Sequence, residues 1–348
     1  MNILLVQTSF LGDIVLSTPV IKGLKTLYPD SRLSLLTTPQ GAELLKNDPL
    51  LDDLIIYDKR GCDSGLAGMF NLIKNIAKKK FNVAYSLHRS YRTALLLRLS
   101  GIPRRVGFKE ARGRLLYTET YRRTEFTHEV LRNLAIFRGE RELDAFDDEL
   151  RLFAPDDSLV KNELKSMVAS VSPYGLVFPG SIWKTKRWSE IEYHRLVMAL
   201  EKESLSVIIA GSKAEVDLCD RVAQDTGAVN LAGQTSMAEL LWLCSRASFM
   251  VCNDSLALHL ASAFKIPTVA LFCSTVPEFG FGPWKNDRAV VLQSEGLACR
   301  PCGRHGRVKC PLGTEECMKA VRAEEVLHHL KALIKCWNIK SSECMDNV

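Results

Sequence analysis

The stretch "SFLGDIVLSTP" (residues 9–19) carries an acidic residue, Asp13, in a turn between a predicted strand and a predicted helix. Dinucleotide-binding folds fill this turn with glycines, so that phosphate can approach the backbone. A carboxylate repels phosphate but can accept a proton, so this turn suits proton transfer better than phosphate binding. The plain alternative is a helix N-cap, because aspartate also accepts backbone N–H groups at a helix start.

Cations and aromatic residues alternate in "FPGSIWKTKRWSE" (178–190), directly after a predicted strand. Hydroxyl and ammonium groups in such a loop, here including Ser181 and Lys186, suit the binding of a nucleotide diphosphate. The plain alternative is a solvent-exposed loop in which Trp188 packs as an anchor for the next helix.

The stretch "CNDSLALHLA" (252–261) predicts a strand that ends at Cys252 and a helix that opens at Asp254 or Ser255. A helix N-terminus favours anions, so we expect phosphate here, with Asp254 on sugar hydroxyls and His259 on the first turns. A capped helix with a solvent-facing histidine is the alternative.

An acid in "AGSKAEVD" (210–217), Glu215, stands on the first turn of the next predicted helix. It could accept ribose hydroxyls, as acids do in other nucleotide-binding folds. Acidic residues are also common at helix starts for dipole reasons alone, so this signal is weak.

The chain has eleven cysteines, and four of them form the pattern "CRPCGRHGRVKCPLGTEEC" (299–317). A leading CxxC pair is typical of tetrahedral zinc sites, but a second tight pair is missing. We therefore expect no bound metal, with zinc as the alternative reading, and no nucleic-acid partner, since no second basic-aromatic element supports one. The four candidate ligands are Cys299, Cys302, Cys310 and Cys317.

Basic residues concentrate between Ser86 and Arg123, where ten lysines and arginines face two glutamates. Ten basic residues minus two glutamates give the segment a charge of +8, which exceeds the net charge of +6 of the whole chain. It indicates an anionic partner for the N-terminal half, with a solvated basic surface as the alternative.

Apolar strand-like runs alternate with amphipathic helix-like runs along both halves of the chain, and the pattern restarts after about residue 155. Such alternation predicts two doubly wound α/β units with parallel sheets, which suits a chain of 348 residues. We expect a first domain over 1–165, a second over 166–322, and an amphipathic C-terminal helix with a tail over 323–348. Ligands of open parallel sheets bind beyond the carboxyl ends of the strands.

Composition is that of a globular protein, with 47% hydrophobic and 25% charged residues. No apolar run approaches the roughly 20 residues that span a bilayer. The start, "MNILLVQTSF", lacks the basic region of a signal peptide and leads straight into a strand. We expect a cytoplasmic protein.

These stretches together resemble glycosyltransferase family 9, the ADP-heptose:lipopolysaccharide heptosyltransferases. The resemblance extends through nearly the whole chain, and its "KRW", "GQTS" and "GIPRRVGF" forms are most similar to heptosyltransferase II. One departure is Leu256, where the family usually has a glycine after Asn-Asp-Ser. The matching stretches are "GDIVLSTPVIKGLKTLYPDSRLSLLT", "GIPRRVGF", "FPGSIWKTKRWSE", "LAGQTSMAEL", "CNDSLALHLASAFKIPTVALF" and "FGPW".

The resemblance implies a GT-B fold of two Rossmann-like domains facing across a cleft, with the C-terminal helix packing back on the first domain. It implies transfer of L-glycero-D-manno-heptose from ADP-heptose to the inner core of lipopolysaccharide, with inversion and without a required cofactor. The acceptor would be a lipid A–Kdo–heptose core, reached by peripheral contact with the inner membrane. Alternatives are a heptosyltransferase I- or III-like enzyme, a transferase using another nucleotide sugar, or a non-catalytic nucleotide-sugar-binding protein.

Residue roles follow from the resemblance position by position. Asp13 matches the proposed base and Lys186 the basic residue at the pyrophosphate. On the acceptor side we expect Gly12 to leave room for the sugar and Ser9 or Thr8 to orient it, while the basic segment would hold phosphates and carboxylates of the acceptor. The expected donor-binding residues are Ser181, Lys186, Glu215, Thr235, Asp254, Ser255 and His259. The expected acceptor-binding residues are Ser9, Gly12, Arg89, Arg92 and Arg112.

Overall fold

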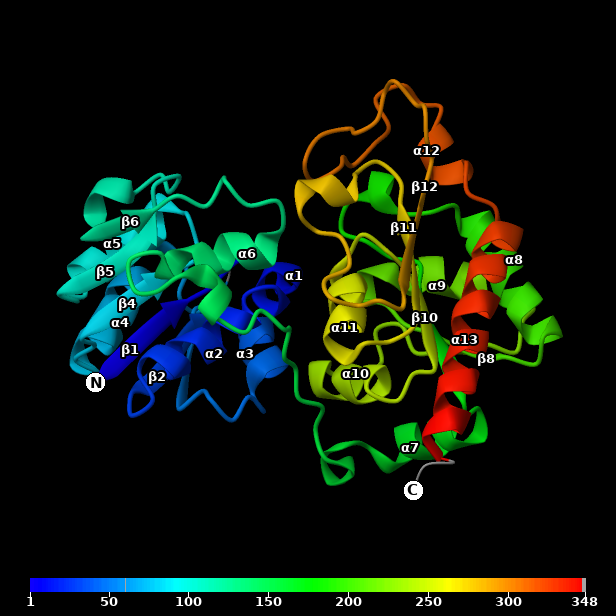
Figure 1. Cartoon of the computed structure of the whole chain (residues 1–348), viewed down its shortest axis with the longest axis horizontal. Coiled ribbons are helices and arrows are strands. Elements are labelled where there is room, and N and C mark those ends of the chain that lie inside the picture. Colours follow the sequence, from blue (N-terminus) through cyan, green and yellow to red (C-terminus); the bar gives the residue numbers. More distant parts are fainter. Residues whose placement is uncertain (60, 346–348) are drawn as a thin grey trace. The chain divides into compact units, whose positions relative to one another are not determined.

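The computed structural model describes residues 1–59 and 61–345, with side chains up to Lys335. The chain forms two compact units, Met1–Phe153 and Ala154–Val348, and Figure 1 shows each as an α/β layer structure. The division falls twelve residues before the predicted boundary at 165, because α7 (Asn162–Ser170) belongs to the second unit.

The first unit contains a parallel sheet with the strand order β3-β2-β1-β4-β5-β6. The central strand β1 is buried from Ile3 to Val6, which explains why it reads as one continuous apolar run. The strands are β1 (Asn2–Val6), β2 (Arg32–Thr37), β3 (Asp53–Ile56), β4 (Val83–Ser86), β5 (Arg104–Phe108) and β6 (Glu119–Tyr121).

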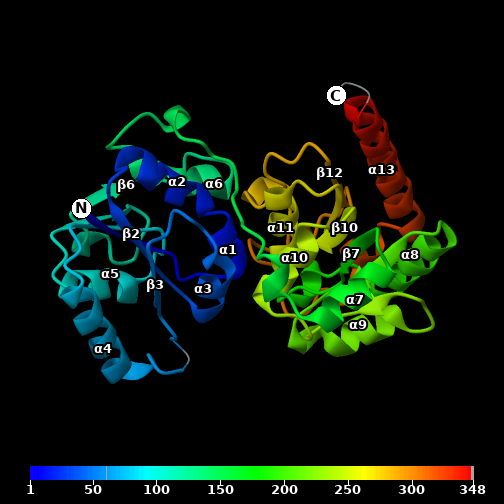
Figure 2. The ribbon, with the colours of Figure 1, turned by 90° about the horizontal axis from the view of Figure 1, so that it is seen from below.

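Helices cover both faces of this sheet (Figure 2). On one face α4 (Gly65–Lys78) and α5 (Tyr91–Leu99) build an apolar layer with β1 and β4. On the other, α2 (Thr18–Leu27) and α6 (Glu129–Leu134) pack against each other. The short helices α1 (Leu11–Val15) and α3 (Pro39–Leu45) follow β1 and β2.

The second unit repeats the same topology, with the strand order β12-β11-β10-β7-β8-β9, all parallel. When the strands of each unit are numbered from its own first strand, both sheets have the 3-2-1-4-5-6 order of Rossmann folds. The predicted fold class is confirmed. The strands are β7 (Tyr174–Phe178), β8 (Ser206–Ile209), β9 (Val229–Asn230), β10 (Phe249–Asn253), β11 (Thr268–Phe272) and β12 (Ala289–Gln293).

One face of the second sheet is covered by three helices that share a single apolar core with it. The opposite face carries α10 (Met237–Cys244) and α11 (Leu256–Phe264), which pack against each other (Figure 1). The three helices of the shared core are α8 (Glu190–Lys202), α9 (Val216–Ala223) and α13 (Ala323–Met345).

The C-terminal helix α13 packs on α8 and β11 of the second unit. Val326 and Leu330 are buried in that unit's core, and the Ala323 N–H donates to the Glu192 carboxylate over 2.9 Å. The packing of this helix on the first domain, which the resemblance implies, stays a prediction. The short α12 (Glu316–Lys319) precedes it. Within 1–59 and 61–345, no helix combines the length and apolarity needed to span a membrane.

Candidate active site

Each sheet has one topological switch point, where neighbouring strands send their connections in opposite directions and leave a crevice at their carboxyl ends. In the first unit it lies between β1 and β4. The loops that follow these strands meet there, since Thr8 Oγ1 and His88 Nδ1 are 3.1 Å apart. The predicted acceptor-side residues Ser9 and Arg89 directly follow Thr8 and His88 in the sequence.

Lys59, which follows β3, also reaches this switch point. Its Nζ donates to the Thr8 carbonyl over 3.0 Å and to the Thr8 hydroxyl over 2.8 Å. Burial lowers the pKa of Lys59 to about 8, with Arg92 adding to the effect, and burial lowers the pKa of His88 to about 4, with Lys59 and Arg89 adding to it. A partly desolvated, cation-rich edge of this kind binds anions.

Asp13 lies on α1, directly beside this edge. Burial, with the Glu129 carboxylate adding to it, raises the pKa of its carboxyl to about 6, against the opposing effects of the Phe10 N–H, Arg123 and Arg89. A carboxyl group titrating near 6 is ionised at neutral pH and still basic enough to take a proton. The N-cap position of α1 is occupied by Phe10, so Asp13 is not the N-cap residue of this helix.

A buried ion pair explains the position of Glu129. Its carboxylate pairs with the Arg123 guanidinium, and both side chains are almost fully buried. Arg132 Nη1 reaches the second oxygen of Glu129 at 3.4 Å. The helix α6 is fixed to the end of α1 by Asn133 Nδ2, which donates to the Leu16 carbonyl over 3.1 Å. Glu129 lies one turn before Asn133 on the same helix face, which places it against α1.

The remaining predicted acceptor residues lie near this edge. Gly12 shares the turn of Asp13 in α1, and the Ser9 N–H donates to Gln7 Oε1 over 3.3 Å. Arg112 is joined to the loop after β4, because its N–H donates to the Arg89 carbonyl over 3.1 Å. The structure thus brings four predicted acceptor residues to one side of the first unit: Ser9, Gly12, Arg89 and Arg112.

The basic segment is only partly available to a ligand. Arg104 on β5 pairs with Glu119 and with Glu140, and Arg123 pairs with Glu129. Within the segment only two glutamates balance the ten cations. The structure adds the carboxylates of residues 129 and 140, which lie outside the segment in the sequence. Part of its positive charge therefore stabilises the fold.

The switch point of the second unit lies between β7 and β10 and holds a second charged pair. Lys186 Nζ lies 2.7 Å from Asp254 Oδ2, and both side chains are largely buried. Thr275 Oγ1, from the loop after β11, donates to the same carboxylate oxygen over 2.6 Å. Two predicted donor residues far apart in sequence are thus in direct contact, at the place where open α/β sheets bind ligands.

Asn253, the residue before Asp254, ties the loop after β7 to β10. Its Nδ2 donates to the Pro179 and Gly180 carbonyls over 3.0 and 3.2 Å, and its Oδ1 accepts the Trp188 N–H over 2.8 Å. Sequence reasoning missed this residue, although an amide at the end of a buried strand is a signal for such bridging. It fixes both ends of the loop that carries Lys186.

Ser181 lies in this loop, and Glu215 lies beside it. Ser181 is buried, and its carbonyl accepts a hydrogen bond from Arg187 Nε over 2.8 Å. The Glu215 carboxylate accepts from Ser212 in a capping box, which supports the helix-start reading. It also lies so close to Gly180 that a Cβ there would stand 2.1 Å from Oε1, so a side chain at position 180 would force the Glu215 carboxylate to move.

The other predicted donor residues occupy two helix starts on the same sheet edge. Ser255 is the N-cap of α11, Leu256 is its first residue, and His259 is buried one turn later, its ring 6.5 Å from the Phe281 ring. Thr235 precedes Ser236, the N-cap of α10, in the segment after β9. That segment is joined to the loop after β8 by its glycine at 233, whose N–H donates to a backbone carbonyl at 211 over 2.9 Å.

The cysteine-rich segment 299–317 packs against the loop of Lys186. The Arg307 N–H donates to Thr185 Oγ1 over 2.7 Å, and Gly306 lies so close that a Cβ would stand 3.1 Å from Lys186 Cγ. The four thiols Cys299, Cys302, Cys310 and Cys317 form no disulfides. Among the described side chains, residues 1–59 and 61–335, no three His, Cys, Asp or Glu groups are arranged to hold a metal ion. The zinc alternative stays a prediction.

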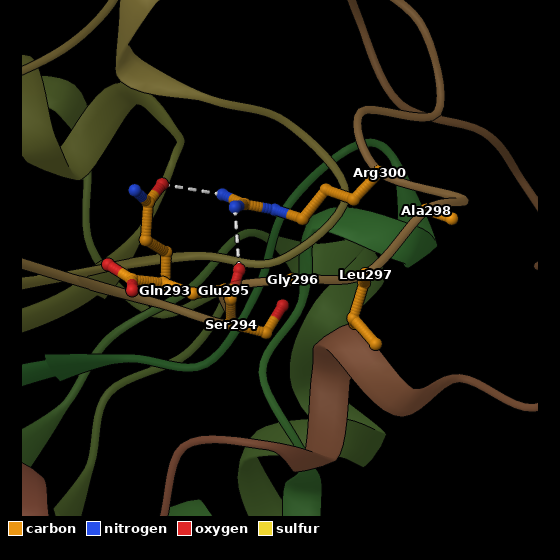
Figure 3. Close-up of a pocket in the computed structure, with 7 residues that line it drawn as sticks. All are labelled: Gln293, Ser294, Glu295, Gly296, Leu297, Ala298 and Arg300. Atoms are coloured by element: carbon orange, nitrogen blue, oxygen red, sulfur yellow. Dashed lines mark hydrogen bonds between the residues drawn. The ribbon is translucent and has the colours of Figure 1, made fainter.

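A wide hollow of about 360 Å³ lies after β12, lined by residues 293–298 and Arg300 (Figure 3). The Arg300 guanidinium donates to Gln293 Oε1 over 2.7 Å and to the Ser294 carbonyl over 2.8 Å. It also donates to backbone carbonyls at the end of β11, so this cation anchors the segment. None of the predicted donor residues lines the hollow, and we assign no ligand to it.

The sequence profile of glycosyltransferase family 9 (heptosyltransferase) matches residues 69–310. The chain belongs to this family. It is therefore a glycosyltransferase, and the predicted resemblance is confirmed.

Relatives with assigned names are distant but span most of the chain. Lipooligosaccharide heptosyltransferase 2 of Campylobacter jejuni is 24% identical over 96% of this chain and 99% of its own length. Lipopolysaccharide heptosyltransferase 3 of Escherichia coli K12 is 25% identical over 78% and 82%. The relatives thus include both type 2 and type 3 enzymes.

Solved structures show the fold independently. A family 9 glycosyltransferase from Veillonella parvula superposes with a TM-score of 0.82 at 18% identity, covering 96% of this chain and 97% of that one. The ADP-heptose heptosyltransferase II of E. coli superposes with a TM-score of 0.77 at 21% identity, covering 97% and 100%. Both similarities extend over nearly the whole chain, which supports its two-unit fold.

Proposed function

We propose that this enzyme transfers L-glycero-D-manno-heptose from ADP-heptose to the inner core of lipopolysaccharide, in a heptosyltransferase II-like reaction with inversion. Membership in a heptosyltransferase family supports the donor. The observation that carries the mechanism is the Asp13 carboxyl, whose pKa of about 6 suits a base at neutral pH. Relatives of types 2 and 3 match at similar identity, so a type III-like acceptor is the nearest alternative.

The second unit would bind the donor. Lys186 lies at the switch point, where its ammonium group can meet the charge that develops on the diphosphate as the glycosidic bond breaks. Asp254, fixed by Thr275, holds this ammonium group in place and would offer its carboxylate to sugar hydroxyls. The N–H groups at the start of α11, after Ser255, add favourable dipoles. In this proposal Lys186 neutralises the leaving group, so no metal or other cofactor is required.

The first unit would bind the acceptor and start the reaction. Asp13 takes the proton from the acceptor hydroxyl, the freed oxygen attacks the anomeric carbon from the face opposite ADP, and ADP leaves with the bonding electrons. A single displacement of this kind inverts the anomeric centre. The cations Lys59, Arg89, Arg92 and Arg112 would hold phosphates and carboxylates of the core.

The acceptor would be a lipid A–Kdo–heptose core at the cytoplasmic face of the inner membrane, where the enzyme would act as a peripheral protein. Support comes from the cation-rich edge around Lys59, because anionic groups of a core would be attracted to it. Exposed cations also attract the anionic lipids of that leaflet.

Transfer is tested by incubating the enzyme with ADP-heptose and a set of truncated core acceptors, followed by mass spectrometry of the acceptors. We expect one added heptose residue on the acceptor that already carries a single heptose. Transfer only to a longer core supports the type III-like alternative. ADP, UDP and GDP are compared by thermal shift, and a stronger shift with UDP or GDP would contradict the proposed donor.

A non-catalytic role is the remaining alternative, and Leu256 at the start of α11 is the feature that favours it. The resemblance implies that the backbone approaches phosphate at this position, where the Leu256 side chain would intervene. No transfer at stoichiometric enzyme, together with a clear thermal shift by ADP, would favour that alternative. Transfer restored or increased by Leu256→Gly would show that the side chain only weakens donor binding.

A further inference from the structure

Four large apolar side chains are exposed on the first unit, around the start of α5. Leu115 is 91% exposed, Leu66 84%, Phe70 56% and Tyr91 54%. Single exposed apolar residues are ordinary on protein surfaces, but a group of large ones rimmed by charge marks an interaction site.

Contacts among three segments bring the backbone positions of these residues near one another. Arg92, on α5, donates through Nη2 to the Gly65 carbonyl over 3.1 Å, which fixes the start of α4 beside the start of α5. Gly113 lies against Tyr91, since a Cβ there would stand 3.4 Å from Tyr91 Cα. Leu66 directly follows Gly65 in the sequence, and Leu115 comes two residues after Gly113, so both lie close to the start of α5. Phe70 stands one turn after Leu66 on the same face of α4.

Cations surround this apolar group. Lys74 Nζ lies 4.6 Å from the centre of the Phe70 ring. Arg112 and Arg114 are exposed on either side of the glycine at 113, next to Leu115. The nearest acid at the start of α4, Asp63, is half-buried and accepts the Asp58 N–H over 2.8 Å. The exposed charge of this surface is thus predominantly positive.

This surface adjoins the candidate acceptor edge. Arg92, which bridges α5 to α4, also stacks on the Tyr57 ring at 5.6 Å, and Lys59 lies over the same ring at 5.4 Å. A lipid-anchored acceptor held at Lys59 and Arg92 therefore has the exposed Leu66 directly beyond its binding residues.

From these observations we infer that Leu66, Phe70, Tyr91 and Leu115, with Lys74, Arg112 and Arg114, form a surface that docks on an anionic lipid bilayer. The inference rests on the proposed lipid-anchored acceptor. Apolar side chains that insert at the interface, together with a cationic rim, are the two signals that peripheral binding requires. A water-soluble acidic partner would need the cations but not a leucine as exposed as Leu115.

The first test is sedimentation of the full chain with vesicles of phosphatidylglycerol and phosphatidylethanolamine. The variant Leu66→Asp/Leu115→Asp should bind at least about tenfold more weakly, since it replaces apolar contacts with charges that anionic lipid repels. The matched control Leu159→Asp/Ile191→Asp changes two side chains of the second unit that are 67% and 63% exposed, and it should bind like the wild type. Equal loss in both variants, or no binding of the wild type, overturns the inference.

The second test compares turnover on two forms of the acceptor, one embedded in vesicles and one with its acyl chains removed. The docking variant should lose turnover about tenfold on the embedded form and keep it on the delipidated form. If the wild type transfers heptose to neither form but binds vesicles, the proposed function fails and the docking surface stands. If sedimentation velocity shows a wild-type dimer and a monomeric docking variant, the surface joins two copies of the chain and the inference is overturned.

Discussion

The two switch points of this enzyme share one topology and differ in how their charges are balanced. In the second unit Lys186 and Asp254 neutralise each other over 2.7 Å, and Thr275 completes the carboxylate's bonding. In the first unit Asp13 stands near another carboxylate, Glu129, and burial raises its pKa to about 6.

This difference separates binding from proton transfer. A paired cation and anion form a stable, oriented site that can exchange partners when a ligand arrives. An acid beside a like charge is destabilised in its ionised form and gains from taking up a proton. In the proposed mechanism the same fold would supply a donor-binding site in one unit and a base in the other, by changing which charges face each other.

The largest expected effect comes from removing the proposed base. Asp13→Asn should lower turnover about 10²–10⁴-fold, the usual contribution of a general base, and leave ADP binding unchanged. Steady-state assays with a core acceptor and calorimetry with ADP measure both. Near wild-type turnover would contradict the assignment.

The same variant has a stability signature that a merely structural role would not give. The raised pKa means that ionised Asp13 costs the folded state free energy above about pH 6 and costs nothing below about pH 4. Asp13→Asn should therefore melt at a higher temperature than the wild type at pH 8, and the gain should vanish toward pH 4. A lower melting temperature at pH 8 would argue that Asp13 is a stabilising residue.

The donor-side counterpart is Lys186→Met, which should lower turnover about 10²–10³-fold. It also leaves the Asp254 carboxylate buried without its cation, which costs about 3–5 kcal/mol of stability. Lys186→Arg keeps the charge and separates the two effects. Lys184→Met, at an exposed lysine two residues earlier, is the matched control. Equal ADP affinity in the Met variant and the control would contradict the donor assignment.

Much of the architecture could be predicted from the sequence, because the buried parallel strands are continuous apolar runs. The apolar runs at 2–6, 32–37, 174–178 and 249–253 are all strands. The strands that escaped are the edge strands β6, β9 and β12 and the neighbouring β5. Of these, β6 and β9 span only three and two residues, and β5 carries polar residues such as Arg104, whose bonding partners Glu119 and Glu140 come from elsewhere in the fold.

The candidate site divides in the same way. Lys186 and Asp254 follow neighbouring strands of a doubly wound sheet, so their proximity follows from topology alone. Lys59, Thr275 and Glu129 were not predictable, because each is placed by packing between segments that no local pattern connects. Glu129 is the clearest case, since it lies 116 positions after Asp13 in the sequence and reaches it only through α6.

A smaller effect concerns Lys59, whose pKa is lowered to about 8. Its positive charge fades as the pH rises through 8, so the KM for an anionic acceptor should rise about three- to tenfold between pH 7 and pH 9. Lys59→Arg should remove this pH dependence, because arginine stays protonated. A KM that rises equally in the arginine variant would assign the effect to another group.

The smallest and most specific effect is a shift of the acid limb in Glu129→Gln. Turnover of the wild type should fall as the pH drops through about 6, because Asp13 becomes protonated. Glutamine removes the neighbouring negative charge and leaves the Arg123 cation, so both changes lower the pKa of Asp13, and the limb should move down by about half a unit to one unit. Turnover at pH 8 should change little. Glu125→Gln, at an exposed acid paired with Arg138, is the control. If turnover at pH 8 falls and the acid limb of the pH profile does not move, Glu129 supports the fold of α6 without changing the pKa of Asp13. The contrast between the two switch points would then rest on the burial of Asp13 alone.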